Sequence, residues 1–454
     1  FWLKRGIRLK ITGLARADLL PLSRLISVSL LISAVPQIGM TERRGSRGGR
    51  PVTAASVAFV SAFLVFSPVA PAFLATVFFA KPLLRPLAVF SSRGCGGVAP
   101  RRAEVAAKGA ETETAVAHLV EAAGNGDVTK VVELLETGVA VDARRPDGQV
   151  AMVSAAVGGH LRVISTLLEA GARVDSTNAK GATALISASH YGHMDVVERL
   201  IEAGASVDAR TSSGATALAA AAEGGQTAVI DRLLVEGAGV DQPSDQDATA
   251  LVLAAQEGKL DAVERLLEAG ASVDRPTSTG TTALMAASQR GWSEVVAELL
   301  DAGAEPDRQD ERGATAMILA AQTGRYEVVS LLAEFGADGN LTRKDGVTAL
   351  MMASQNGHIA AVDELLRVNC TLEAERDDGG TALIFAAMMG KGPVVARLLN
   401  AGANKDHVAG NGATAIKLAA QYNHATVVKI LTEAGASGTK GAGRAVDIND
   451  IFSK

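Results

Sequence analysis

The chain has 454 residues, of which 48% are hydrophobic and only 4% aromatic, so its core must be built from small and aliphatic side chains. The net charge of −5 is unevenly divided. Residues 1–103 carry 15 Lys and Arg and only two acids, Asp18 and Glu42, whereas residues 104–454 carry 29 basic and 47 acidic side chains. An acidic body repels phosphate backbones, which disfavours nucleic-acid binding. Two cysteines, Cys95 and Cys370, are too few for a disulfide framework and do not form a zinc motif.

The first 103 residues have the composition of a targeting or membrane-facing leader. The first methionine is Met40, so residues 1–39 come either from upstream translation or from a fragment of a longer protein. Four arginines follow within residues 43–50, and then an uncharged run over residues 51–80. That run is long enough to span a bilayer, so contact with a membrane is one possible role of the leader.

Three interpretations of residues 40–103 remain open. In the first, Val52–Phe66 is the apolar stretch of a signal peptide that ends at the cleavage site Ala70-Pro71-Ala72. The acid-free stretch up to residue 102 would then be a transit peptide, and the whole segment resembles the bipartite plastid-targeting leaders of algae with secondary plastids. In the second, residues 51–80 are an uncleaved membrane anchor, and in the third the protein is secreted. We therefore expect plastid delivery, with membrane anchoring and the secretory pathway as alternatives.

One unit of 33 residues repeats through the remainder of the chain without a single insertion. Thr-Ala-Leu or a close variant begins at each of eight positions, namely Thr183, Thr216, Thr249, Thr282, Thr315, Thr348, Thr381 and Thr414. Degenerate copies in the same register begin at Val150 and Ala117. The pattern predicts ten units over about 111–441, in a repeat domain spanning 104–441 that is followed by a short tail or cap at 442–454.

Each unit is predicted to form a helix, a turn, a second helix and a loop. In the third unit Thr183 can cap the first helix, Gly192 breaks it, and Gly204 ends the second helix. Apolar residues recur on one face of the second helix, and this stripe places Leu267 of the fifth unit in the core. In the loop, Asp208 and its equivalents are expected to bond their own backbone and so fix a tight turn.

The stretch TALISASHYGHMDVVERLIEAGASVDAR resembles the ankyrin repeat. It has that family's Thr-x-Leu opening, Gly-His turn, Val-Val-x-x-Leu second helix and Gly-Ala exit. The resemblance implies an all-α solenoid of stacked helix-turn-helix units with hairpin-like loops, whose concave face binds other proteins. The chain departs from the family where Ala replaces the Pro of the opening, and where Asn369-Cys370 replaces Gly-Ala in the eighth unit.

No catalytic or cofactor motif rises above the repeats, which favours a protein that is not an enzyme. Four histidines occupy the Gly-His turn, where the repeat itself accounts for them: His160, His193, His358 and His424. No nucleophile, metal-ligand cluster or phosphate-binding glycine loop accompanies them. No cofactor or metal is therefore expected.

The variable residues at the end of each first helix are the candidates for partner binding. Four consecutive units place glutamine there, which suits hydrogen bonding to the backbone of an extended peptide. An apolar patch and an Arg-Trp pair accompany this row. The candidates are Gln256, Gln289, Gln322, Gln355 and Gln421, with Met388, Met389 and Tyr422 as the patch and Arg290 and Trp292 as the pair.

These residues predict an interaction scaffold or adaptor that binds a protein or extended peptide. Because the repeat region is acidic, the partner is expected to be neutral or basic. The alternative is a membrane-anchored receptor or scaffold with one N-terminal transmembrane segment.

Overall fold

The structure is a computed structural model that describes residues 99–437, with side chains from residue 112 onward. Within this range twenty helices, α1 to α20, follow one another in chain order and form ten consecutive pairs. The described range contains no strand, only an isolated antiparallel bridge between Arg144 and Val150. The prediction of an all-α stack of helix-turn-helix units is confirmed.

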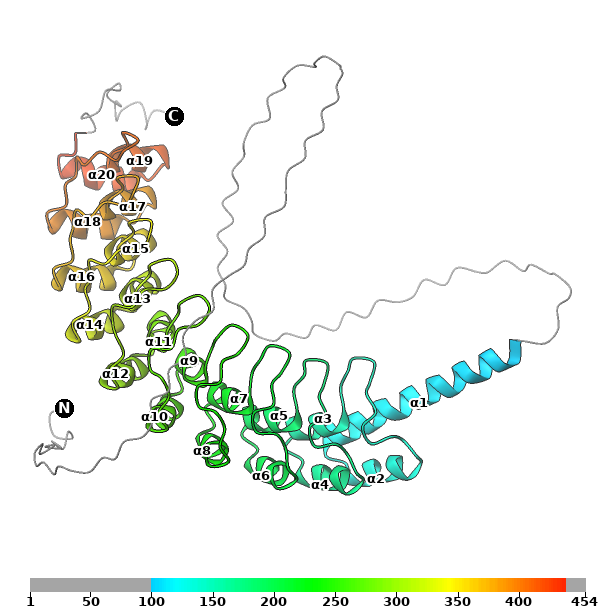
Figure 1. The fold of residues 1–454 in the computed structure, drawn as a ribbon. Helices are drawn as coiled ribbons and strands as arrows, with labels where there is room; N and C mark the ends of the chain where they lie inside the picture. Colours follow the sequence, from blue (N-terminus) through cyan, green and yellow to red (C-terminus); the bar gives the residue numbers. More distant parts are fainter. Residues whose placement is uncertain (1–98, 438–454) are drawn as a thin grey trace, which may run out of the picture. The chain divides into compact units, whose positions relative to one another are not determined.

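The first helices of the pairs line the inner side of a curved stack, and the second helices lie on its outer side (Figure 1). Each first helix contacts the first helix of the neighbouring pair, and the second helices contact one another in the same way. The first helices are α1 (Ala99–Asn125), α3 (Ala151–Val157), α5 (Ala184–Tyr191), α7 (Ala217–Gly224), α9 (Ala250–Gln256), α11 (Ala283–Arg290), α13 (Ala316–Thr323), α15 (Ala349–Asn356), α17 (Ala382–Met388) and α19 (Ala415–Gln421). The second helices are α2 (Val128–Glu136), α4 (Leu161–Glu169), α6 (Met194–Glu202), α8 (Thr227–Val235), α10 (Leu260–Glu268), α12 (Ser293–Asp301), α14 (Tyr326–Glu334), α16 (Ile359–Arg367), α18 (Gly392–Asn400) and α20 (Ala425–Glu433).

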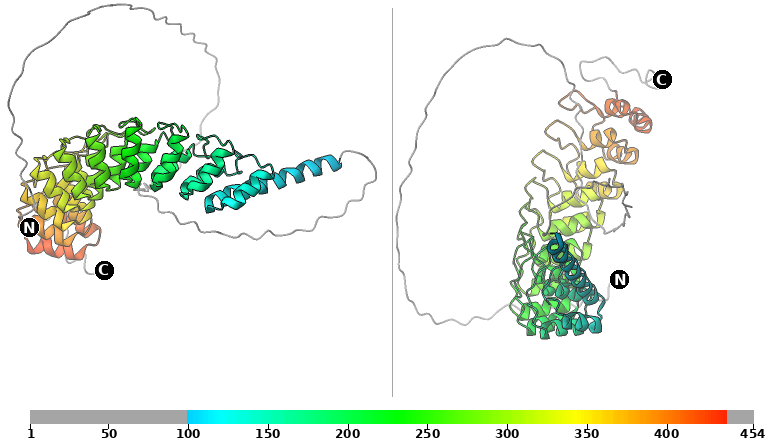
Figure 2. Two further views of the ribbon diagram at one scale, coloured as in Figure 1. Left: turned by 90° about the horizontal axis from the view of Figure 1, so that it is seen from below. Right: turned by 90° about the vertical axis from the view of Figure 1, so that its right-hand side faces the viewer.

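The first helix differs from the others in length. With 27 residues, α1 begins at Ala99, upstream of the predicted domain boundary at residue 104. Figure 2 shows it continuing beyond the stack as a single helix. Its last turns pack like a repeat helix, since Leu119 and Ala123 are fully buried. The predicted leader up to residue 98 and the predicted tail at 442–454 lie outside the described residues.

In the third unit, local signals set the helix ends as the sequence predicts. Thr183 accepts a hydrogen bond from the backbone N–H of Ile186 at 3.3 Å and so caps α5. Gly192 ends the same helix with φ of 76°, and Gly204 follows α6 with φ of 83°, both in the left-handed region that glycine adopts without strain. Asn369 takes over this role in the eighth unit with φ of 57°.

The loop aspartates join neighbouring units, so the prediction that they fix their own turns is wrong. Asp208 accepts from the backbone N–H of Gly239, 31 residues further on, at 3.2 Å. The same bond recurs from unit to unit: Asp142 accepts from Arg173, Asp175 from Ser206, Asp241 from Ser272, Asp274 from Glu305, Asp307 from Asp338, Asn340 from Thr371, Glu373 from Asn404 and Asp406 from Ser437. A side-chain oxygen, most often that of Asp, is therefore placed here because the adjacent unit has an N–H to satisfy.

Loop tips are joined to each other as well. The backbone N–H of Ser212 donates to the carbonyl of Lys180 at 2.9 Å, and Glu311 donates to Thr279 at 3.0 Å in the same geometry. Because these bonds lie at the far end of each loop, they hold adjacent loops side by side over their whole length.

The core is made by stacking rather than by any single unit. Buried Ala, Val and Leu form one continuous cluster from Leu119 to Ala436. Within α10 the fully buried leucine is Leu266, whereas Leu267 is only partly buried against the cluster. The assignment of Leu267 as the deep core position is therefore corrected by one residue.

We expect Leu266→Ala to lower the free energy of unfolding by about 2–5 kcal/mol, because it opens a cavity between two units. The matched change Leu267→Ala should cost clearly less, about 1 kcal/mol, since its side chain already meets solvent. Urea denaturation followed by far-UV circular dichroism measures both. Equal losses would contradict the burial assignment.

Three buried serines break the apolar core without gaining a hydrogen bond. Ser189, Ser288 and Ser354 occupy the same repeat position, are fully buried, and have hydroxyls with no partner, whereas the other units place Ala there. We expect Ser288→Ala to raise the free energy of unfolding by about 1 kcal/mol, because a buried unsatisfied hydroxyl costs about 1–3 kcal/mol. The control is Ser187→Ala, since the Ser187 hydroxyl donates to the Thr183 carbonyl at 3.1 Å. A gain as large in the control would show that helix propensity alone is responsible.

Candidate partner-binding surface

The predicted glutamine row lies at one register along the stack. Gln256 ends α9, Gln421 ends α19, and the other three are the next-to-last residues of α11, α13 and α15. Because neighbouring first helices are in contact, the row runs from unit to unit along the side where each first helix turns into the second. Gln289 and Gln421 are exposed, and Gln256, Gln322 and Gln355 are half-buried. The structure thus places all five on one edge of the inner face, at the helix ends remote from the loop tips.

The backbone beneath this row is used for stacking. The carbonyl of Gln322 accepts from the His358 ring at 3.1 Å and from the Asn356 side chain at 2.8 Å. The carbonyl of Gln289 accepts from the Thr323 hydroxyl at 2.9 Å. The row's peptide groups are therefore held in place by the next unit, which fixes the starting point of each glutamine side chain.

The glutamine side chains themselves are largely unused by the fold. The Gln256 amide donates to Glu257 at 3.2 Å. Within residues 112–437, the side chains of Gln289, Gln322, Gln355 and Gln421 have no hydrogen bond to another residue. Each amide can therefore offer one acceptor and two donor hydrogens to a partner at no cost to the stack.

The turn histidines have the structural role that the repeat pattern predicts. The Nε2 atom of His160 lies 2.9 Å from the carbonyl of Gly124 in the preceding unit, and His193, His358 and His424 make the corresponding bond at 3.0 to 3.1 Å. Since a carbonyl only accepts, Nε2 must carry the hydrogen in each case. These rings act as ties between units.

Trp292 takes the same position as the histidines and makes the same bond. Its Nε1 donates to the Gln256 carbonyl at 3.0 Å, and the ring lies against Gly258, where an added Cβ would sit 2.5 Å from it. The side chain is still 43% exposed, so it both packs in its turn and presents an aromatic face. Arg290, the other member of the predicted pair, is exposed and forms no ion pair with a described residue.

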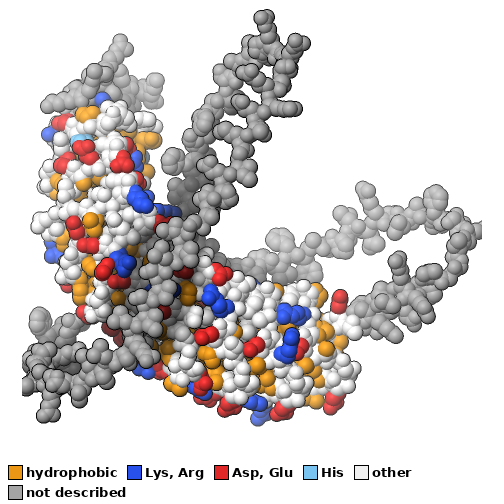
Figure 3. Space-filling view, viewed as in Figure 1, with side chains coloured by type: hydrophobic (Ala, Val, Ile, Leu, Met, Phe, Trp, Pro, Cys, Tyr) orange, Lys and Arg blue, Asp and Glu red, His pale blue; other side chains and the backbone are white. Residues whose placement is uncertain are grey.

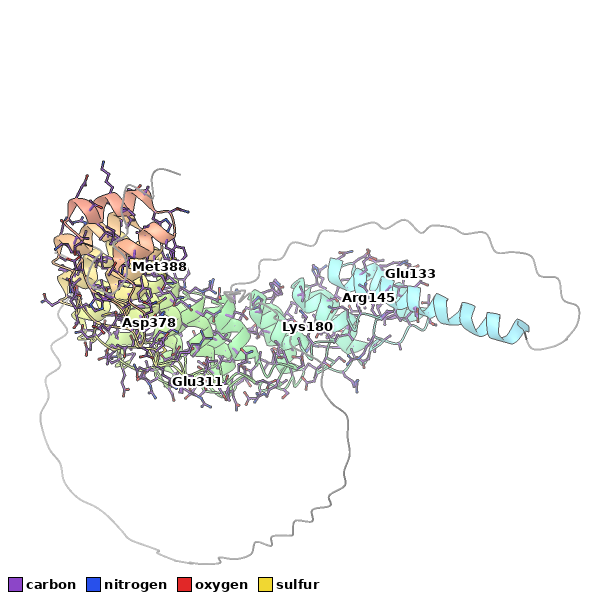
Figure 4. The ribbon with its side chains drawn as sticks, turned by 90° about the horizontal axis from the view of Figure 1, so that it is seen from above. Glu133, Arg145, Lys180, Glu311, Asp378 and Met388 are labelled. Carbon is purple, nitrogen blue, oxygen red and sulfur yellow. The ribbon has the colours of Figure 1, made fainter. Side chains whose placement is uncertain are left out.

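The predicted apolar patch lies on the ends of α17 and α19. Met389 is 42% and Tyr422 50% exposed, whereas Met388 is half-buried and its carbonyl accepts from His424 at 3.0 Å. The Tyr422 ring stacks on His424 with a centroid distance of 6.4 Å, which holds the aromatic face in a defined orientation. Figure 4 labels Met388 among these C-terminal units. The patch offers a flexible thioether surface beside a rigid ring.

Sequence reasoning missed a second set of side chains on the same face. Leu253, Leu319 and Leu418 lie three residues before the glutamine position and are partly exposed. At the corresponding place in α17 the Phe385 ring is covered by the guanidinium of Arg376, 4.8 Å from its centroid. The signal was present in the sequence, because the residue at this position varies from unit to unit.

Charges along the loops are mixed in sign. Arg145, Lys180, Glu311 and Asp378 follow one another along the stack in Figure 4. A hydrogen bond from Arg376 lowers the pKa of Asp378, so this pair is charged but internally compensated. On the face seen in Figure 3, acidic, basic and apolar side chains are interspersed. The loops therefore lack the single-sign stripe that phosphate backbones require.

No arrangement of reactive groups stands out among the described residues. Cys370 is buried, and this burial, with the charge of Asp338, raises the pKa of its thiol to about 11. The thiol is therefore protonated at neutral pH and is a poor nucleophile. Within the described range no cluster of His, Cys, Asp and Glu could hold a metal ion. No helix in that range is both long and apolar enough to cross a bilayer.

The stacking geometry defines the class of protein, and comparison with known families agrees. The family model for ankyrin repeats matches residues 119–211, 206–277, 284–375 and 350–441. Together these matches cover more than half of the chain, which therefore belongs to the ankyrin-repeat family. A search of curated proteins found no match. Ankyrin repeats serve as protein-interaction scaffolds, which is the general function that family membership supports.

Proposed function

We propose that this protein binds an extended segment of a neutral or basic partner protein along its glutamine row. The supporting observation concerns Gln289, Gln322 and Gln355. Their backbones belong to the stack, whereas their side-chain amides have no described hydrogen-bond partner. Units spaced about 10 Å apart would present one amide for about every three residues of extended peptide. Such a row recognises peptide groups rather than particular side chains.

The Met388, Met389 and Tyr422 patch would add apolar anchoring at one end of the row. Peptide hydrogen bonds exchange with water and contribute little net free energy, so affinity needs a desolvated apolar contact. Arg290 and Trp292 would provide a second anchor. In this arrangement the amides set the direction of the bound chain and the anchors set its position along the stack.

The proposal is tested by capture with the full chain and with two variants. One changes Gln256, Gln289, Gln322 and Gln355 to Lys and Met388 and Met389 to Ser; the control changes Val235, an 80% exposed residue at the end of α8, to Ser. We expect the first variant to bind its partners at least tenfold more weakly, which corresponds to a loss of about 1.4 kcal/mol or more of binding free energy. Quantitative mass spectrometry of the captured proteins measures this. Identical partner lists for the parent and both variants would show that the row is not the binding surface.

We also propose that the basic segment 1–103 delivers the repeat domain to a plastid, with an uncleaved membrane anchor as the alternative. Its composition supports this proposal, whereas its residues up to 98 lie outside the described structure. N-terminal sequencing of the protein from its own cells should find a mature end near Phe73 or near residue 103. Full-length protein that resists a carbonate wash would instead support the membrane-anchored receptor.

A further inference from the structure

A recess opens on the outer side of the stack at three consecutive units. It lies between α12, α14 and α16 and has a volume of about 390 Å³. Ser293 of α12 and Glu364 of α16 contribute to its lining. Helix α14 contributes Tyr326, Glu327, Leu331 and Glu334. A second, smaller recess beside Trp292 also includes Ser293, so the two adjoin. The volume is in the range of a small binding site.

The recess lies at units that lack an arginine found in four of the ten units. At one position of the second helix the units place Arg199, Arg232 and Arg265, and later Arg397. Arg265 donates through Nε to Asp231 of the preceding unit at 2.8 Å, and Arg397 lies 3.1 Å from Asp363 in the same way. Arg265 and Arg397 thus bridge to the preceding second helix, whereas Arg199 and Arg232 pair within their own units. The units between Arg265 and Arg397 have Glu298, Leu331 and Glu364 at this position, so they lack an arginine bridge from it.

The same change leaves an excess of negative charge. Helices α12 and α14 together contain five acids and neither Lys nor Arg, namely Glu294, Glu298, Asp301, Glu327 and Glu334. Burial raises the pKa of Glu298, and the nearby charges of Glu264 and Asp301 add to that rise. Among the described residues, the cation bonded to the recess lining is Arg367, which pairs with Glu364 at 2.5 Å and donates to the Ser330 hydroxyl at 3.3 Å. Glu334 forms no ion pair with a described residue.

Aromatic and apolar surface accompanies these carboxylates. Tyr326 is 47% exposed, and its hydroxyl donates to Glu327 at 3.2 Å, which holds the ring and the carboxylate beside each other. Leu331 is half-buried at the floor, and Trp292 flanks the adjoining recess. A planar cation above an aromatic ring, with carboxylates at its edge, gains both cation–π attraction and bidentate hydrogen bonds.

We propose that this recess binds an arginine-containing segment of a partner protein. Guanidinium fits the combination better than ammonium, because it stacks on rings and pairs with carboxylates through two parallel N–H groups. The partner would then supply an arginine where these three units have none at this position. The surface lies on the outer helices, and Trp292 is the residue it shares with the anchors proposed for the glutamine row.

Trp292 provides a direct measurement on the full chain. The sequence contains only two tryptophans, Trp2 and Trp292, so a Trp2→Phe background leaves one reporter beside the recess. The probe is the peptide amide Gly-Arg-Gly-Arg-Gly, with matched peptides in which lysine or neutral citrulline replaces arginine. We expect a saturable fluorescence change with the arginine peptide below about 1 mM. Lysine should bind about threefold more weakly, and citrulline should not bind.

Repeat symmetry supplies matched variants. Glu327→Gln with Glu334→Gln should weaken the arginine peptide at least tenfold. The same changes at the equivalent positions of α6, Asp195→Asn with Glu202→Gln, should alter it less than twofold, because α6 does not line the recess. Leu331→Arg introduces the residue that four other units have at this position, with Glu327 and Glu334 within reach on its own helix, and should also weaken binding at least tenfold. Its thermal midpoint should stay within a few degrees of the parent, which excludes misfolding.

The contrary outcomes are equally specific. No binding by the parent up to about 10 mM, or equal loss in the α6 control, overturns the recess as the site. If the peptide of residues 43–50, which is rich in arginine, binds tenfold more tightly than the probe, the occupant is this chain's own leader and the partner assignment is wrong. The glutamine and methionine variant should bind the probe as the parent does, which separates this proposal from the one above.

Discussion

Every unit of this protein is incomplete without its neighbour. Apart from α1, the helices within residues 99–437 have seven to nine residues, too short to be stable alone in water. Each unit also leaves polar groups that only the adjacent unit satisfies. The Asp208 carboxylate needs the N–H of Gly239, and the Gly124 carbonyl needs the His160 ring. Burial and hydrogen bonding thus act across the same boundary, and stability is a sum of nearest-neighbour contributions.

Because the units depend on one another, some surface residues are needed for stacking and others are not. Residues that tie units together repeat closely, as the turn histidines and loop aspartates do. The bond made by the turn histidines requires only a hydrogen-bond donor, so other residues can replace histidine there. Trp292 and Gln226 both donate to the carbonyl 36 residues earlier in the chain. Such substitutions keep the stack intact while changing what it exposes. Trp292 is the clearest case, since a packing residue there also presents an aromatic face.

The two proposed surfaces follow the same logic from opposite sides. On the inner side, a repeated residue is presented outward because its backbone alone is needed for stacking. On the outer side, three consecutive units lack an arginine that four other units have, and a recess lined by carboxylates and an aromatic ring lies there. The first surface depends on what the units share and the second on where they differ. A solenoid can therefore carry separate binding surfaces without adding a domain.

The sequence by itself determined the helix pairs, their caps and the family, because the 33-residue period and the Thr and Gly signals act within one unit. It also placed the glutamines at one register, since identical units repeat identical geometry. Only the tertiary structure decided which of two adjacent leucines, Leu266 or Leu267, is fully buried, and that Asp208 bonds the next unit rather than its own loop. It likewise decided that Leu331 and Glu364 line a recess. These outcomes depend on contacts between neighbouring units, such as those between residues 31 to 36 positions apart. The residue pattern within one unit does not specify how closely the next unit packs against it.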